Sequence, residues 1–226
     1  MNRTIKIAID GPAGAGKSSV AKILAEKLGY IYIDTGAMYR AITYKIIKEK
    51  INLHNNSQIK DLINQTIIEF NNSHGFSNQR IFCDGIDVTQ EIRSPQVTDL
   101  VSKVASLPEI RGTMVKLQQR LGSLNNVVMD GRDIGTVVMP EAEFKFYLTA
   151  SIEERAKRRA VEMKNKGYLV NDEQILNDIS NRDKADSQRD VSPLKPADDA
   201  LIIDTSCLSL QQVVDKLLSI IQKRGV

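Results

Sequence analysis

One short segment, residues 11–18, constrains the fold of this chain more than any other. It reads GPAGAGKS, satisfies the pattern G-x-x-x-x-G-K-S, and lies between an apolar run and a helical pattern. Glycines let successive backbone N–H groups curve around phosphate oxygens, and the N-terminus of the following helix adds partial positive charge. The segment therefore predicts a phosphate-binding loop, or P-loop. A flexible glycine turn is the alternative, and the strand–loop–helix context disfavours it.

Two side chains of this loop carry specific expectations. Lys17 is predicted to reach the β and γ phosphates of a nucleoside triphosphate, and the Ser18 hydroxyl is predicted to ligate Mg²⁺. The ATP-binding residues predicted from the motif and its continuation are Gly11, Pro12, Ala13, Gly14, Ala15, Gly16, Lys17, Ser18 and Ser19.

The rest of the chain alternates between apolar runs and helical patterns. The runs that we expect to form strands are residues 6–10, 30–34, 127–130, 144–149 and 201–204. Amphipathic helical patterns follow, the clearest being residues 18–28 and 209–223. This alternation predicts an α/β fold with a five-stranded parallel sheet flanked by helices on both faces.

Residues 60–98 break the alternation. Short apolar runs are separated there by Asn/Ser/Gly-rich segments, and Asp84-Gly85 fits a tight hairpin turn, so we expect a small antiparallel β insertion. We predict one P-loop unit over residues 1–226, because no linker divides the chain. Its parts are a core of about 1–34, 100–150 and 190–226, an acceptor-binding insertion of about 35–100, and a short helical lid of about 151–189.

Composition excludes several functions. The net charge is only +3 over 226 residues and aromatic residues make up 5%, which argues against a nucleic-acid partner. Two separated cysteines and two histidines exclude a disulfide framework and a Cys/His zinc cluster. No run approaches the roughly 18 uncharged apolar residues that span a bilayer, so we expect a cytoplasmic protein with no membrane partner. We also expect a monomer, because no long apolar stripe is left unassigned.

Two predicted strand ends carry candidate acceptor residues. The second strand leads into DTGAMYR, which places Thr35 and Arg40 at the carboxyl edge of the sheet, where open α/β folds bind ligands. The third strand ends in DGRD, where Asp130 is the predicted partner of Mg²⁺ through water and Arg132 and Asp133 point toward the acceptor. Ordinary helix capping by Thr35 and a solvated glycine turn at DGRD are the alternatives.

Two helical patterns further along carry arginines. After Ser151, a run places Arg155, Arg158 and Arg159 on one helical face, which we interpret as a mobile lid that meets the β and γ phosphates. A solvent-facing arginine surface is the alternative.

The second of these patterns contains Arg182, Asp186 and Arg189, which are spaced by four and three residues. A helix through them would align two cations and one acid on a single edge. A salt-bridged surface stripe is the alternative, since such exposed pairs are common and individually weak.

Taken together, five segments resemble the bacterial cytidylate kinases, in order and nearly end to end: GPAGAGKSS, DTGAMYR, EIRSPQVTDLVSKVASLPEIR, DGRDIGTVV and NRDKADSQRDVSPL. The P-loop is shared by many families, whereas DGRDIGTVV and the enlarged insertion are far more restrictive. The resemblance implies transfer of the γ-phosphoryl group of ATP to CMP or dCMP with Mg²⁺.

The resemblance also implies roles for individual residues. Ser102, Arg111 and Asp133 would read the cytosine edge; Arg40, Arg132 and Arg189 would clamp the acceptor phosphate; Arg182 and Asp186 would contact the pentose. The full substrate-binding set that it implies is Thr35, Tyr39, Arg40, Ser102, Arg111, Asp130, Arg132, Asp133, Arg182, Asp186 and Arg189. The implied catalytic residues are Lys17, Arg132, Arg155, Arg159 and Arg189.

Other activities remain as alternatives at this point. A regulatory GTPase would carry Asn-Lys-x-Asp and Asp-x-x-Gly, and neither occurs in the chain. A kinase of UMP, AMP or a small metabolite such as shikimate is the first competitor. A non-catalytic nucleotide-dependent switch or a nucleic-acid-binding ATPase is the second.

Overall fold

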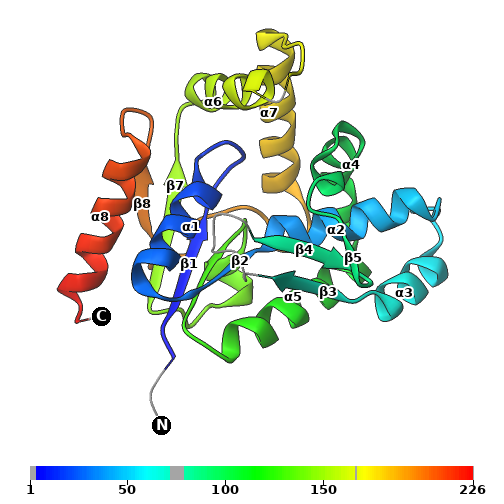
Figure 1. The fold of residues 1–226 in the computed structure, drawn as a ribbon, viewed down its shortest axis with the longest axis horizontal. Coiled ribbons are helices and arrows are strands. Elements are labelled where there is room, and N and C mark those ends of the chain that lie inside the picture. Colours follow the sequence, from blue (N-terminus) through cyan, green and yellow to red (C-terminus); the bar gives the residue numbers. More distant parts are fainter. Residues whose placement is uncertain (1–3, 72–78, 166, 226) are drawn as a thin grey trace.

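The computed structural model describes residues 4–71, 79–165 and 167–225, and a parallel sheet lies at its centre (Figure 1). Its five strands stand in the order β2-β6-β1-β7-β8, and every pairing is parallel. The strands are β1 (Lys6–Asp10), β2 (Ile31–Asp34), β6 (Val127–Asp130), β7 (Phe144–Thr149) and β8 (Leu201–Asp204). The predicted sheet is confirmed, with one strand starting a residue later because Tyr30 N–H donates to Ala25 O at the end of the preceding helix.

Helices cover both faces of the sheet, as expected from the sequence. Ile7 and Ile9 of β1 pack into one apolar cluster with α1 (Lys17–Leu28) and α8 (Leu210–Lys223). Ala8, which points to the opposite face, joins a second cluster. The helices of that second cluster are α2 (Thr35–Lys48), α3 (Asn56–Gln65), α4 (Pro95–Ser106) and α5 (Pro108–Ser123).

The predicted antiparallel insertion is present. Its three-stranded sheet has the order β3-β4-β5, with β3 (Ile68–Asn71), β4 (Arg80–Cys83) and β5 (Ile86–Asp87), and it is followed by the short helical turn η2 (Glu91–Arg93). Asp84 and Gly85 join β4 to β5 with φ values of 52° and 76°, which is the left-handed pair that a two-residue hairpin turn requires. Ile81 of β4 packs in the same cluster as Ala8, so insertion and central sheet share one core.

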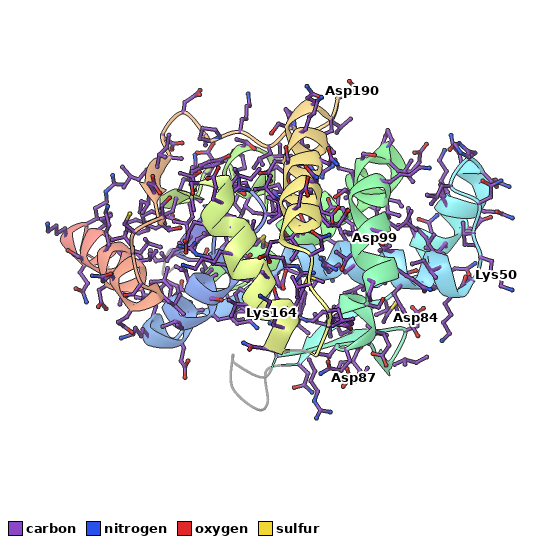
Figure 2. The ribbon with its side chains drawn as sticks, turned by 90° about the horizontal axis from the view of Figure 1, so that it is seen from above. Lys50, Asp84, Asp87, Asp99, Lys164 and Asp190 are labelled. Carbon is purple, nitrogen blue, oxygen red and sulfur yellow. The ribbon has the colours of Figure 1, made fainter. Side chains whose placement is uncertain are left out.

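Two helices, α6 (Ile152–Asn165) and α7 (Asp172–Gln188), stand above the carboxyl ends of the strands (Figure 1). Seen from above, they cross the middle of the molecule, between α1 and α8 on one side and α2, α3 and α4 on the other (Figure 2). They pack on each other through a small cluster of their own, made of Ala156, Ala160, Ile175 and Ile179. Within the described ranges, no helix combines the length and apolar character needed to cross a membrane.

Candidate active site

The P-loop follows β1 directly and leads into α1, as the motif predicts. Gly11 has φ 144°, and a Cβ built on it would lie 2.0 Å from Leu148 O of β7, so only glycine fits between the loop and the sheet. Lys17 is buried, and its Nζ donates a hydrogen bond to Pro12 O at 2.7 Å. The lysine is therefore folded back over the loop that would hold the phosphates.

Lys17 lies in an environment that is short of negative charge. Burial, followed by the neighbouring Arg132 guanidinium, lowers its pKa to about 7, although Asp130 opposes the change. A bound polyphosphate would supply the missing negative charge, because an anion near an ammonium group favours its protonated form.

Asp130 ends β6 beside the start of α1. Its Oδ2 accepts a hydrogen bond from Ser18 Oγ at 2.8 Å, and its Oδ1 accepts one from Tyr32 Oη at 2.8 Å. Burial, with the nearby charge of Asp34, raises the pKa of Asp130 to about 6. The two residues predicted to meet Mg²⁺ are thus adjacent. Sequence reasoning missed Tyr32, whose only signal is an aromatic residue in a short strand beside the P-loop.

Thr35, at the start of α2, does not cap the helix that it begins. It is buried, and its Oγ1 donates to the backbone oxygen of Asp130 at 2.7 Å, which ties β2 to the DGRD turn. The helix is capped instead by Asp34, whose carboxylate accepts from Ala37 N–H at 2.9 Å. The capping alternative for Thr35 is therefore wrong, and a direct contact with substrate stays a prediction.

Four arginines gather on the acceptor side. Arg132 Nε donates to Asp186 Oδ2 at 2.8 Å, and Arg40 Nη1 donates to Ile92 O and Thr98 Oγ1 at 3.1 and 2.9 Å. Burial lowers the pKa of Arg40 to about 10.

Arg182 and Arg189 complete this group. Burial and the nearby charges of Arg132 and Arg40 lower the pKa of Arg182 to about 9. Arg182 Nε and Arg189 Nη2 are buried without a hydrogen-bond partner in the described part of the chain. Arg182 and Asp186 lie in α7, as predicted, but Arg189 follows the helix end at Gln188 with an extended ψ of 144°.

The residues predicted to read a base form a buried pair. Arg111 on α5 is 2% exposed, and its Nη1 donates to Asp133 Oδ2 at 2.6 Å. The guanidinium of Arg111 also lies over the Tyr39 ring, 5.3 Å from the ring centroid. Ser102 lines the cleft from α4, and so does Asp99 one turn earlier on that helix, labelled in Figure 2.

The three arginines of α6 have different hydrogen-bond and ion-pair partners. Arg155 is buried against the P-loop, where its Nη1 donates to Ala13 O at 3.1 Å. Arg158 and Arg159 both line the cleft. Arg158 also donates to Thr205 O at 2.7 Å, and Arg159 pairs with Glu162 at 2.8 Å. Two of the three arginines therefore line the cleft, and Arg155 does not. A direct phosphate contact of Arg155 or Arg159 stays a prediction.

Asp10, at the end of β1, is a buried acid that sequence reasoning missed. Its two carboxylate oxygens accept from the N–H groups of Ile134 and Gly135 at 2.8 and 2.7 Å. These N–H groups belong to the short helical turn η3 (Ile134–Val138), which follows DGRD. Asp10 therefore accepts hydrogen bonds from the first two residues of this turn. Burial raises its pKa to about 6. Its partners are more than 120 residues away, and only an acid directly before the first motif glycine signals it.

One cleft of about 1140 Å³ lies over the carboxyl ends of the strands, a volume that is ample for two nucleotides. The predicted site residues outside the P-loop that line it are Arg40, Ser102, Asp130, Arg132, Arg159 and Arg182. Those that do not line it are Thr35, Tyr39, Arg111, Asp133, Arg155, Asp186 and Arg189. The P-loop residues from Ala13 to Ser19 line one end. The other end is lined by residues of α2, α4 and α7, among them Arg40, Ser102 and Arg182.

Comparisons with known proteins agree with this geometry. The family model described as cytidylate kinase matches residues 7–223. Curated cytidylate kinases of Bacillus cereus and Bacillus anthracis are each 52% identical over 221 residues, covering 98% of this chain and 97% of theirs. Among solved structures, an uncharacterized protein from Eubacterium ventriosum aligns with a TM-score of 0.52 at 13% identity, covering 98% of this chain and 99% of that one, which supports the fold alone.

Proposed function

Because this chain belongs to the cytidylate kinase family, we propose that it transfers the γ-phosphoryl group of ATP to CMP or dCMP, giving ADP and CDP or dCDP. The observation that carries this proposal is the cluster of buried cations in one cleft, with Lys17 close to Arg132 and Arg182. Two nucleotides that meet through their phosphates would neutralise this cluster. A single nucleotide in the P-loop would leave the acceptor-side guanidiniums of Arg40 and Arg182 without a phosphate.

The donor end would hold ATP through the P-loop amides from Gly14 to Ser19. Lys17 would leave Pro12 O and turn to the β and γ phosphates, because a phosphate oxygen is a stronger partner for an ammonium group than a carbonyl oxygen.

The adjacent pair of Ser18 and Asp130 fits Mg²⁺. The described residues contain no group of three or more carboxylate, histidine or cysteine ligands that could hold a metal ion. Mg²⁺ needs no such group, since it keeps several waters and takes phosphate oxygens as ligands. We place the ion on Ser18 Oγ, with Asp130 acting through water. An ion held there would neutralise charge on the transferring phosphates.

The acceptor end would hold CMP by its phosphate, pentose and base. Arg40, Arg132 and Arg189 would grip the α-phosphate, and Arg182 with Asp186 would contact the pentose. The base would meet Ser102, Arg111 and Asp133, since a carboxylate accepts from the exocyclic amine while hydroxyl and guanidinium groups donate to O2 and N3. Thr35, Tyr39 and Asp130 would shape the wall between the two nucleotides.

The chemistry then needs positioning and charge neutralisation more than a general base. The attacking oxygen belongs to a phosphate that is largely ionised at neutral pH. Lys17, Arg132, Arg159 and Arg189 would stabilise the charge that spreads over the transferring group, and Arg155 would support the loop from its far side. We place this reaction in pyrimidine nucleotide metabolism, in the cytoplasm, carried out by a monomer without a nucleic-acid or membrane partner.

The experiment that tests the function measures ADP formation from Mg-ATP with CMP, dCMP, UMP, AMP, GMP, shikimate or no acceptor. We expect the highest kcat/KM with CMP or dCMP and only slow turnover without an acceptor. A preference for AMP, GMP or shikimate contradicts the proposal. So does ATP hydrolysis that no monophosphate stimulates, which is the expected result for a nucleotide-dependent switch.

A further inference from the structure

Asp183, on α7, joins parts of the chain that are far apart in sequence. Its Oδ1 accepts a hydrogen bond from Ala13 N–H of the P-loop at 3.2 Å, and its Oδ2 forms an ion pair with Arg155 of α6. Arg155 Nη1 donates in turn to Ala13 O at 3.1 Å, and its Nε donates to Ala150 O at 3.0 Å. One carboxylate and one guanidinium therefore hold both backbone polar groups of Ala13.

The same stretch of α7 also faces the acceptor side. Arg182, the preceding residue, lines the cleft, and Asp186, one helical turn later, holds Arg132 at 2.8 Å. A single turn of helix thus contacts the donor loop through Asp183 and the proposed acceptor clamp through Asp186, and it lines the cleft with Arg182. The distance between the two half-sites depends on where this turn lies.

The contacts of Asp183 and Arg155 with Ala13 form a joint between α7 and the P-loop. This joint matters because the α6–α7 unit has little other packing against the central sheet. The buried apolar cluster of these two helices is small, and its partly buried neighbours, Ile152, Met163, Val170 and Leu176, also belong to the α6–α7 segment. Apolar packing against the central sheet therefore does little to fix the position of α7 over the P-loop. Polar contacts such as those of Asp183 have to define it.

We propose that Asp183 is a positioning residue that sets α7 in register with the P-loop, and so aligns the acceptor phosphate with the donor phosphate. The proposal rests on the function proposed above and adds a residue to it. In-line transfer between two bound phosphates is sensitive to misplacement, and an error of about 1 Å can cost about 100-fold in rate. Loss of the joint leaves both half-sites chemically intact and changes their relative position.

A different role for the same contact predicts the opposite result. A carboxylate on a P-loop amide could act as a stand-in for a phosphate that ATP must displace. Removing it would then strengthen ATP binding. A side chain that takes the place of a bound phosphate should lie in the cleft. Ala13 lines the cleft, but Asp183 and Arg155 do not, which argues against this role.

The test uses Asp183→Asn, which keeps the shape and one acceptor oxygen but loses the ion pair, and Asp183→Ala, which loses both contacts. The control is Asp172→Asn, an exposed acid in the first turn of the same helix. Wild-type activity with CMP is measured first, so a failure of the proposed function is recognised before any variant is compared. Thermal melting then identifies any variant that is unfolded at the assay temperature.

We expect kcat to fall about 10- to 100-fold in Asp183→Asn, with KM for ATP and for CMP each within about threefold of wild type. Asp172→Asn should match wild type. In an Arg155→Ala background, Asp183→Asn should cost less than about threefold more, because both changes break one joint. The proposal is overturned if kcat of Asp183→Asn stays within about threefold of wild type, or if its activity is lost through a higher KM for ATP or CMP. It is also overturned if the KM for ATP falls, or if the effects of the two substitutions are additive in the double variant. All of these measurements use Asp183→Asn, so they test the proposal even if Asp183→Ala does not fold.

Discussion

At the scale of single residues, the cleft carries positive charge that the described protein groups only partly balance. The pKa values of Lys17, Arg40 and Arg182 are all lowered, in each case first by burial. Desolvated cations of this kind raise the free energy of the nucleotide-free protein. A bound polyanion would interact favourably with these cations, so their desolvation in the nucleotide-free protein strengthens nucleotide binding.

The first prediction concerns the proton on Lys17. Its pKa is about 7 in the nucleotide-free protein, so at pH 8 the side chain is mostly neutral. A bound phosphate raises the pKa of an ammonium group, so ATP binding at pH 8 should take up close to one proton. Calorimetric titrations in buffers of different ionisation enthalpy measure this number. Lys17→Met should abolish the uptake, and a wild-type binding enthalpy that is independent of buffer contradicts the prediction.

The second prediction concerns Arg182. Replacing it by Met keeps an apolar stem and removes a buried cation whose Nε has no hydrogen-bond partner among the described residues. We expect the nucleotide-free variant to melt at or above the wild-type temperature, because burying an unneutralised charge is costly. The KM for CMP should rise at least 10-fold. Arg120→Met, at an exposed position on α5, should change neither value. A variant that melts well below wild type shows that Arg182 stabilises the empty protein.

At the scale of elements, the distance between a glycine and the backbone of a neighbouring element determines whether a larger side chain fits there. Gly11 touches the backbone of β7, whereas the turn residue Gly85 has open space around it. Both have positive φ, so each suffers backbone strain when substituted.

The third prediction compares these two glycines. Gly85→Ala should lower the free energy of unfolding by about 1 kcal/mol and leave kcat unchanged, because only backbone strain is added. Gly11→Ala should abolish measurable ATP binding, because the 2.0 Å clash forces the loop away from the sheet. Urea unfolding and nucleotide titration measure both effects. Equal behaviour of the two variants would contradict the role assigned to the contact with β7.

The elements also show where sequence patterns were sufficient. The hairpin turn, the P-loop and the capping box of α8, in which Ser209 and Gln212 cap each other, follow from residues close together in the chain. The contacts of Asp10 and Asp183 span 124 and 170 residues, and no local pattern contains them. Similarly, Arg155 and Arg159 are four residues apart on one helix, yet one supports the P-loop and the other faces the cleft.

At the scale of the whole molecule, the α6–α7 unit has a smaller buried apolar cluster than α1 and α8. Its own apolar cluster has four buried residues, while α1 and α8 share a much larger cluster with the sheet. Segments with few buried apolar contacts open at low free energy.

The fourth prediction follows from this difference. In the nucleotide-free protein, backbone amides of α6 and α7 should exchange with solvent faster than those of α8. Adding CMP with a non-hydrolysable ATP analogue should slow exchange in α6 and α7 at least 10-fold, since the bound phosphates join the cations on both sides of the cleft. Hydrogen-exchange mass spectrometry measures this, with α8 as the internal control. Equal protection of the three helices before and after ligand addition would contradict it.

The sequence alone determined the parallel sheet, the P-loop between β1 and α1, the antiparallel insertion and the kind of chemistry expected, because each of these depends on residues adjacent in the chain. Tertiary structure decided which polar groups meet: that Arg111 pairs with Asp133, that Thr35 binds a backbone oxygen, that Asp10 accepts from η3, and that Asp183 joins α7 to the P-loop. The physical reason is that the energy of a buried charge depends on its neighbours in space, and these come together only when distant strands and helices pack.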